Sequence, residues 1–187
     1  MFEHGFKTWC ETYAVEKRKE LRLNARDPLD PRVLATHLDV RVWTPDDVPK
    51  LSHQTKSVLL RNDGKTPSCW SAVTLVVQAK VVVILNSSHS KPRQSSDLMH
   101  ELAHQIRGHK PHDMEISAEG MMFVPSYDKH GEDEADWLSG CLLLPRPALV
   151  YIKSKRILDE DVVVQYGASK KMLGYRMAST GVNRQFA

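Results

Sequence analysis

The sequence contains little cysteine and no long apolar run. Its 187 residues include three widely spaced cysteines, Cys10, Cys69 and Cys141, so we expect neither a disulfide framework nor a zinc-binding cysteine pair. The most apolar stretch, residues 72–85, is interrupted by a glutamine and a lysine, which argues against a membrane span. The first residues lack a basic start followed by an apolar block, so no signal peptide is expected. These absences favour a cytoplasmic protein with no membrane attachment.

The sequence also lacks a large excess of either positive or negative charge. The formal net charge is +3, with 41% hydrophobic and 26% charged residues, which is ordinary for a globular chain of one main domain. Such a small excess of positive charge neither requires nor excludes nucleic acid. The mixed-charge segment EKRKELR, residues 16–22, has helical spacing and predicts a solvated helix face.

Periodicity and turn residues predict a mainly helical chain with a few strands in its first half. Ser95 or Ser96 is expected to cap the central helix, and Gly108 to end it. The Asp63-Gly64 pair is a turn signal, with a candidate strand before it at residues 57–60. Residues 78–79 join two strands as a hairpin. The predicted strands are 40–43, 71–77 and 80–86, and the predicted helices are 6–23, 31–38, 132–145, 147–153, 159–166 and 169–180.

The central helix carries the pattern His-Glu-x-x-His. His100 and His104 are four residues apart, so they share one helix face and can point at one ion. Glu101 lies beside them, where a carboxylate can take a proton from a water molecule. Apolar residues on another face and the absence of Pro or Gly from residue 94 to residue 107 support a helix here. Two surface histidines on an ordinary helix would be the alternative interpretation.

A catalytic zinc site needs a third protein ligand and an open position. The acidic start of the later helix offers Glu132 and Glu134, which lie about 200° apart around a helix and cannot both address one ion. Asp136 shares a face with Glu132, so Glu132 could bind the metal while Asp136 orients a ligand histidine. We favour Glu132, and Glu134 stays open as the alternative. Any of these acids could instead complement the helix dipole.

These ligand types predict Zn²⁺ as the cofactor, although imidazole and carboxylate also suit Mn²⁺ or Fe²⁺. The expected chemistry is peptide-bond hydrolysis, in which Glu101 takes a proton from water and passes one to the leaving amine. A developing oxyanion needs a further donor. The sequence does not choose among the candidates His109, His112, Tyr127 and His130.

The motif SSDLMHELAH and the segment EDEADWLSGCLLLP together resemble the ImmA/IrrE family of metallopeptidases. The second segment is similar to the family's pattern at Glu132, Ala135, Asp136, Leu142, Leu143 and Pro145, with Leu138 and Ser139 as mild departures. The apolar strand ending at Asn86 and the closing segment 162–182 extend the resemblance. It covers about the last 110 residues well and the first 70 poorly.

The resemblance implies an α+β, zincin-like fold that is mainly helical, with a small antiparallel or mixed sheet beside the motif helix. It also implies Glu132 as the ligand. We expect a metallopeptidase domain at residues 1–155 and a small helical segment resembling a helix-turn-helix, packed on it, at residues 156–187. The implied activity is site-specific cleavage of a helix-turn-helix transcriptional repressor in a phage, mobile-element or stress-response system.

Two other functions stay open. The first is a non-catalytic, metal-containing regulator, antitoxin-like or DNA-binding, and the second is a hydrolase of small amides. In a DNA-reading arrangement Ser169 would cap the second helix and three basic residues would reach phosphates: Lys170, Lys171 and Arg176. The apolar residues of that helix instead predict packing on the catalytic domain, and one basic helix is not a basic face, so we do not expect DNA binding.

Overall fold

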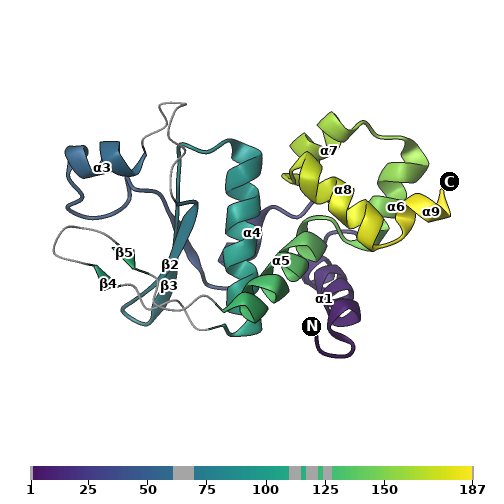
Figure 1. The fold of residues 1–187 in the computed structure, drawn as a ribbon, viewed down its shortest axis with the longest axis horizontal. Helices are drawn as coiled ribbons and strands as arrows, with labels where there is room; N and C mark the ends of the chain where they lie inside the picture. Colours follow the sequence, from purple (N-terminus) through teal and green to yellow (C-terminus); the bar gives the residue numbers. More distant parts are fainter. Residues whose placement is uncertain (1, 61–69, 110–114, 117–121, 124–127, 187) are drawn as a thin grey trace.

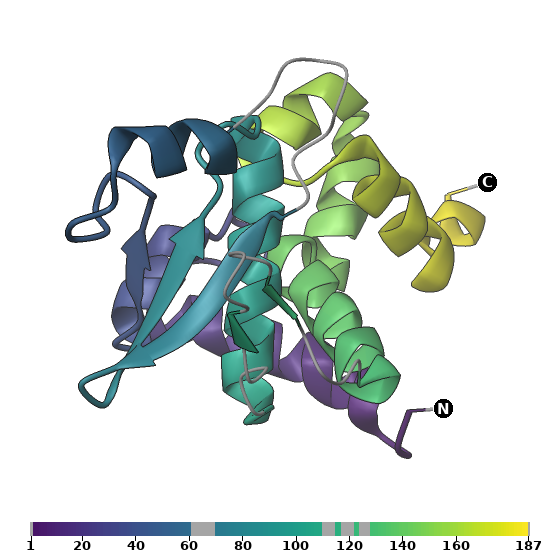
Figure 2. The same cartoon turned by 60° about the vertical axis from the view of Figure 1, so that its left-hand side comes forward.

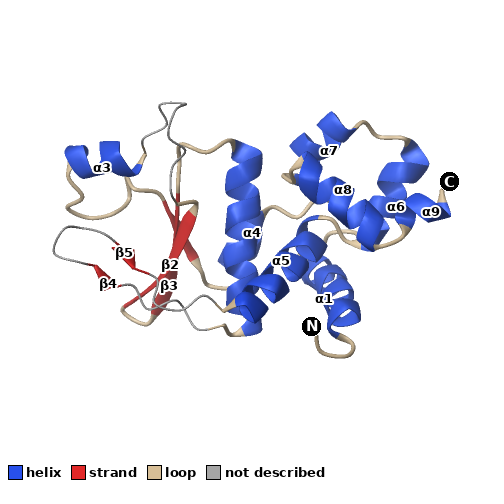
Figure 3. Ribbon diagram, viewed as in Figure 1, coloured by secondary structure: helices blue, strands red, loops and turns tan. Residues whose placement is uncertain are grey.

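The structure is a computed structural model that describes residues 2–60, 70–109, 115–116, 122–123 and 128–186. Its helices and strands form an α+β arrangement, with a small sheet at one side, α4 in the centre and the C-terminal helices at the other side (Figures 1 and 3). The expected zincin-like fold class is confirmed by this architecture. The helices are α1 (Phe6–Glu20), α2 (Pro31–His37), α3 (His53–Leu59), α4 (Lys91–Arg107), α5 (Lys129–Leu143), α6 (Arg146–Lys155), α7 (Asp159–Tyr166), α8 (Lys170–Ser179) and α9 (Val182–Gln185).

The sheet beside α4 is mixed. Strand β3 (Lys80–Leu85) lies between β1 (Arg41–Trp43), which runs parallel to it, and β2 (Ala72–Val77), which runs antiparallel. The predicted hairpin between β2 and β3 is confirmed. Gln78 and Ala79 both have positive φ, 50° and 61°, which matches the twist of a tight two-residue turn although neither residue is glycine.

The prediction of a strand before the Asp63-Gly64 turn was wrong. Residues 57–60 are not a strand, because α3 occupies His53–Leu59 and Ser52 caps it by accepting from the Thr55 N–H. The Asp63-Gly64 turn lies outside the described residues. The short antiparallel pair β4 (Glu115–Ile116) and β5 (Met122–Phe123) was not predicted.

Helix α4 crosses the molecule and is buried along one side by Leu98, Met99 and Leu102. It begins five or six residues earlier than expected, with Ser90 at its N-cap position, so Ser95 and Ser96 lie inside it and neither is the cap. Pro92 is compatible with the first turn, where its missing N–H has no helical partner to lose. The end at Gly108 is confirmed, with φ 68°.

Helix α5 packs against both α4 and α1 (Figure 2). Asp128 caps its start by accepting from the His130 N–H. From Ala135 onward it is buried on most sides, and its core residues join α4, α1 and the C-terminal helices in one apolar cluster. Cys10 of α1 and Cys141 of α5 are free, fully buried thiols. Contact with Cys10 and burial together raise the pKa of Cys141.

The prediction of a solvated face at residues 16–22 was wrong for Arg18, which is fully buried. Its guanidinium donates to the carbonyls of Ala14, Asp27 and Leu142 at 3.0, 2.8 and 2.7 Å. Leu142 belongs to the last turn of α5, where carbonyls lack helical partners. Arg18 therefore ties the end of α5 to α1.

The C-terminal helices continue the same core. Ser169 caps α8 by accepting from the Met172 N–H, as predicted, and Leu173 and Met177 are buried. Arg176 is fully buried and paired with Glu11, so it does not face a nucleic acid. Lys170 pairs with Glu160. Within the described part of the chain, no helix is long and apolar enough to cross a membrane.

Candidate metal centre

The structure brings His100, His104 and Glu132 to one point between α4 and α5. The two histidines lie one turn apart on α4, and their Nε2 atoms are 3.0 Å from each other. Glu132, in the first turn of α5, places its Oε2 3.2 Å from His100 Nε2 and its Oε1 3.4 Å from His104 Nε2. One ligand atom from each of these half-buried side chains lies within 4.8 Å of the others.

This spacing fits a tetrahedral divalent ion. Ligands bound at about 2.0–2.1 Å in tetrahedral geometry are about 3.3 Å apart. The three separations of 3.0, 3.2 and 3.4 Å lie close to that length. Two imidazole nitrogens and one carboxylate form a donor set that leaves a fourth position for water or substrate.

Glu101 follows His100 on α4, and its side chain contacts the sheet. The Thr74 hydroxyl of β2 donates a hydrogen bond to Glu101 Oε2. This contact holds the Glu101 carboxylate between α4 and the edge strand β2 of the three-stranded sheet. Thr74 was missed by sequence reasoning, because nothing local to the motif indicates which strand residue faces it.

Asp136 lies where its helical position predicted. Its Oδ1 is 3.1 Å from Nδ1 of His100, on the ring side opposite the donor cluster. Burial alone would lower the pKa of His100, but the hydrogen bond to Asp136 and the neighbouring carboxylates raise it overall. The same hydrogen bond lowers the pKa of Asp136. An ionised Asp136 can therefore hold His100 as the Nδ1–H tautomer, which presents Nε2 to an ion.

Glu134 faces away from the three donors. Its carboxylate is 3% exposed, and Oε2 accepts from Arg107 Nε at 2.7 Å and lies 3.2 Å from His109 Nε2. Burial would raise the pKa of Glu134, but the hydrogen bonds from Arg107 and His109 hold it below its usual value. Of the two acids that the sequence left open, Glu132 meets the histidines and Glu134 does not.

The candidate oxyanion donors fall in different places. His109 contacts His104 Nδ1 at 2.9 Å rather than the open side of the donor cluster. His130 lies 3.8 Å from Glu134 Oε1 and is half exposed. His112 and Tyr127 lie outside the described residues.

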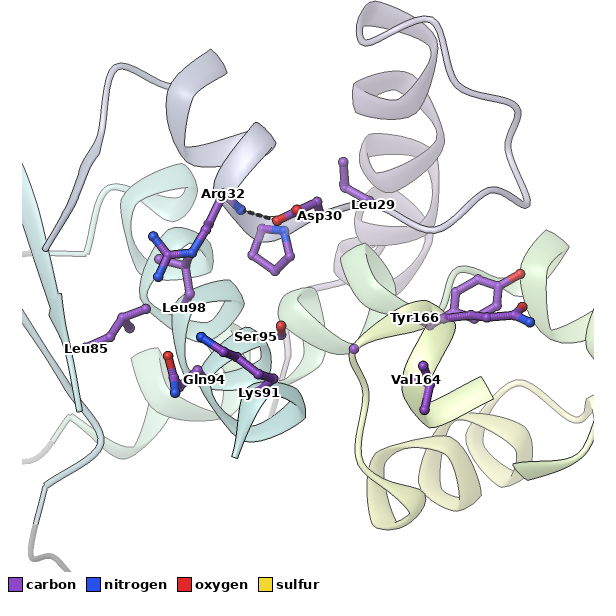
Figure 4. Close-up of a pocket in the computed structure, with 13 residues that line it drawn as sticks. Leu29, Asp30, Arg32, Leu85, Lys91, Gln94, Ser95, Leu98, Val164 and Tyr166 are labelled. Atoms are coloured by element: carbon purple, nitrogen blue, oxygen red, sulfur yellow. Dashed lines mark hydrogen bonds between the residues drawn. The ribbon is translucent and has the colours of Figure 1, made fainter. Parts of the chain in front are cut away.

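A cavity of about 300 Å³ lies along the first turns of α4, away from these side chains (Figure 4). It is bounded by α4, the start of α2 and the end of α7, with Lys91, Gln94 and Leu98 on the α4 side. None of the four residues of the motif and its acidic partner, His100, Glu101, His104 and Glu132, lines it. The cavity is therefore separate from the candidate metal centre.

Comparison with known proteins gives one match. A family model named Peptidase_M78, described as an IrrE N-terminal-like domain, matches residues 54–178. That interval spans β2, β3, α4 and α5, and so includes every residue of the site described above. No curated protein and no solved structure matches the chain.

Proposed function

This chain belongs to the Peptidase_M78 family of ImmA/IrrE-type metallopeptidases, and from that premise we propose that it is a zinc-dependent endopeptidase. The observation that carries the proposal is the convergence of His100, His104 and Glu132 within 4.8 Å, with Glu101 directly after His100 on the same helix. A structural zinc site normally has four protein ligands, whereas a catalytic one keeps a position open. Three converging donors and an adjacent carboxylate fit the catalytic type.

The proposed roles follow from the contacts. An ion held by His100, His104 and Glu132 would supply Lewis acidity to the scissile carbonyl and acidify a water molecule. Glu101 takes the proton of that water and delivers a proton to the nitrogen of the leaving amine. Thr74 orients the Glu101 carboxylate through its hydrogen bond.

The substrate that we propose is a protein segment in extended conformation. β2 is the terminal strand of its sheet in the described part of the chain and carries Thr74, which contacts Glu101. A terminal strand offers backbone N–H and C=O groups with which an extended peptide can pair. The resemblance to ImmA/IrrE proteins supports a helix-turn-helix repressor as the protein that contains this segment.

The test is the variant Glu101→Gln, and measurement of its zinc content is the control for an intact metal site. We expect wild-type protein with Zn²⁺ to cleave a helix-turn-helix repressor encoded beside its gene, and the variant to be at least about 100-fold slower. Zinc content should be unchanged, because Glu101 is not among the three donors. Equal cleavage by wild type and variant would refute the role of Glu101. Zinc binding without cleavage of any protein would favour the non-catalytic regulator.

A further inference from the structure

His104 has a partner on each ring nitrogen. Its Nε2 faces the donor cluster, 3.0 Å from His100 Nε2. Its Nδ1 lies 2.9 Å from Nδ1 of His109. Two imidazole nitrogens at this distance share one proton, so one ring donates and the other accepts. Which ring donates decides whether His104 Nε2 offers a lone pair to an ion.

The contact of the other ring nitrogen of His109 indicates which of the two rings, His104 or His109, donates the shared proton. His109 Nε2 is 3.2 Å from Glu134 Oε2, a buried carboxylate oxygen that also accepts from Arg107. An ionised carboxylate only accepts, so His109 Nε2 carries a proton. A neutral His109 then accepts at Nδ1 from the Nδ1–H of His104. That tautomer leaves Nε2 of His104 as the nitrogen that an ion can bind; without an ion, the same rule gives one shared proton to the contact between His104 Nε2 and His100 Nε2.

The backbone is shaped to bring His109 to this place. Gly108 adopts the left-handed conformation at the end of α4, and the His109 N–H donates to the His104 carbonyl at 3.0 Å. The chain therefore folds back so that His109 lies beside His104. On the α5 side, a Cβ at Gly131 would lie 3.5 Å from His109 Nδ1 and 2.9 Å from Asp128 Oδ2. Glycine at this position therefore leaves room for the Asp128 carboxylate, while the imidazole of His109 lies at ordinary contact distance.

We propose that Glu134 and His109 form a relay that fixes the tautomer of His104 and so positions it as a metal ligand. His100 is held directly by a carboxylate, that of Asp136, whereas His104 is held by a carboxylate through a second imidazole. His109 and Glu134 are positioning residues, since they act through His104. The inference rests on the metal site of the proposed function but not on peptidase activity.

A purely structural Arg107–Glu134 ion pair would be the simpler interpretation. It would need no particular residue at position 109, whereas the relay needs a hydrogen-bond acceptor facing His104 Nδ1. Asn places its amide oxygen near the position of the histidine Nδ1, and Leu offers no acceptor. The pair His109→Asn and His109→Leu therefore separates the two interpretations. Asp133→Asn is the matched control for Glu134→Gln, because exposed Asp133 pairs only with Lys129 among the described residues.

The first measurement is the tautomer of His104 by nitrogen-15 NMR of the metal-free full chain. We expect Nδ1 of His104 to carry a proton in wild type and in His109→Asn, and to lose that proton in part of the molecules in His109→Leu. An unchanged tautomer in His109→Leu would overturn the relay. This readout does not depend on peptidase activity, so a chain that binds zinc but cleaves no protein would count against the proposed function alone.

The second measurement is zinc affinity, by competition with a chromophoric chelator. Loss of a group that orients a ligand histidine typically weakens metal binding about 10–100-fold. We expect that loss for His109→Leu and for Glu134→Gln, and no more than about a threefold change for His109→Asn and Asp133→Asn. Wild-type affinity in folded His109→Leu would overturn the proposal. Should Glu134→Gln fail to fold, the two position-109 variants still decide the question.

Discussion

Replacing the buried arginine of α1 should destabilise the protein strongly. Arg18→Met removes hydrogen bonds to four backbone carbonyls, of which those of Leu142 and Leu143 belong to the last turn of α5. Methionine fills much of the same volume, so the main effect is the loss of donors to buried acceptors. We expect the free energy of unfolding to fall by about 2–5 kcal/mol.

The magnitude follows from two opposing effects. Hydrogen bonds to a charged group contribute about 1.5–3 kcal/mol each, and Arg18 makes three at 3.0 Å or less. Against this, burial lowers the pKa of Arg18 to about 10, which corresponds to a cost of about 3 kcal/mol at 1.36 kcal/mol per unit. The bonds outweigh the cost, and their surplus is the expected loss.

Urea unfolding at pH 7, followed by circular dichroism, measures this change. Lys19→Met is the matched control, because Lys19 is exposed on the same helix and surface substitutions usually change stability by less than about 0.5 kcal/mol. If the two variants unfold at the same urea concentration, the reasoning about Arg18 is wrong. Since α5 also carries Glu132, we further expect Arg18→Met to weaken zinc binding.

Three other predictions concern α8, the site and the surface. Ser169→Ala removes the cap of α8 and should cost about 1 kcal/mol in thermal or urea unfolding; no measurable cost would contradict the cap. Thr74→Val should lower kcat about tenfold, the effect of about 1.4 kcal/mol, and leave zinc affinity unchanged. Thr74→Ser keeps the hydroxyl and should keep most of the activity. An unchanged kcat in Thr74→Val would show that the hydrogen bond to Glu101 has no catalytic role. Hydrogen bonds from Lys17 and, to a smaller extent, His37 lower the pKa of Glu20 in the folded protein. Ionised Glu20 therefore contributes its full stabilisation above the ordinary glutamate pKa of about 4.3, and this contribution is lost as the pH falls through the lower pKa of the folded state. The urea midpoint of wild type should therefore exceed that of Glu20→Gln at pH 7 and approach it near pH 3, and a gap that widens on acidification would refute this.

The features that the sequence predicted well are local. His100 and His104 face one point because four residues make about one helical turn, and the fold class was implied by the resemblance of two short motifs to the ImmA/IrrE family. The preference for Glu132 over Glu134 also came from angles around a single helix. Each inference needed only residues close together in the chain, so no tertiary contact had to be known.

The features that it missed depend on contacts between distant segments. Thr74 reaches Glu101 only because β2 packs beside α4. Arg18 lies among other charged residues, and the charge pattern does not reveal which of them meets the carbonyls at the end of α5. The helical state of residues 57–59 had a local signal, the cap at Ser52, but the β-branched and apolar residues that follow favoured a strand.

The two buried thiols between α1 and α5 can be used to measure how often these two helices separate. Cys10 and Cys141 are fully covered in the folded state, and thiol reagents attack only an accessible thiolate. In a Cys69→Ser background, the rate of labelling therefore measures how often α1 separates from α5. Cys10 and Cys141 lie on the same two helices that Arg18 connects. Their labelling therefore reports on the helices that support the metal centre, without modifying a residue of the centre.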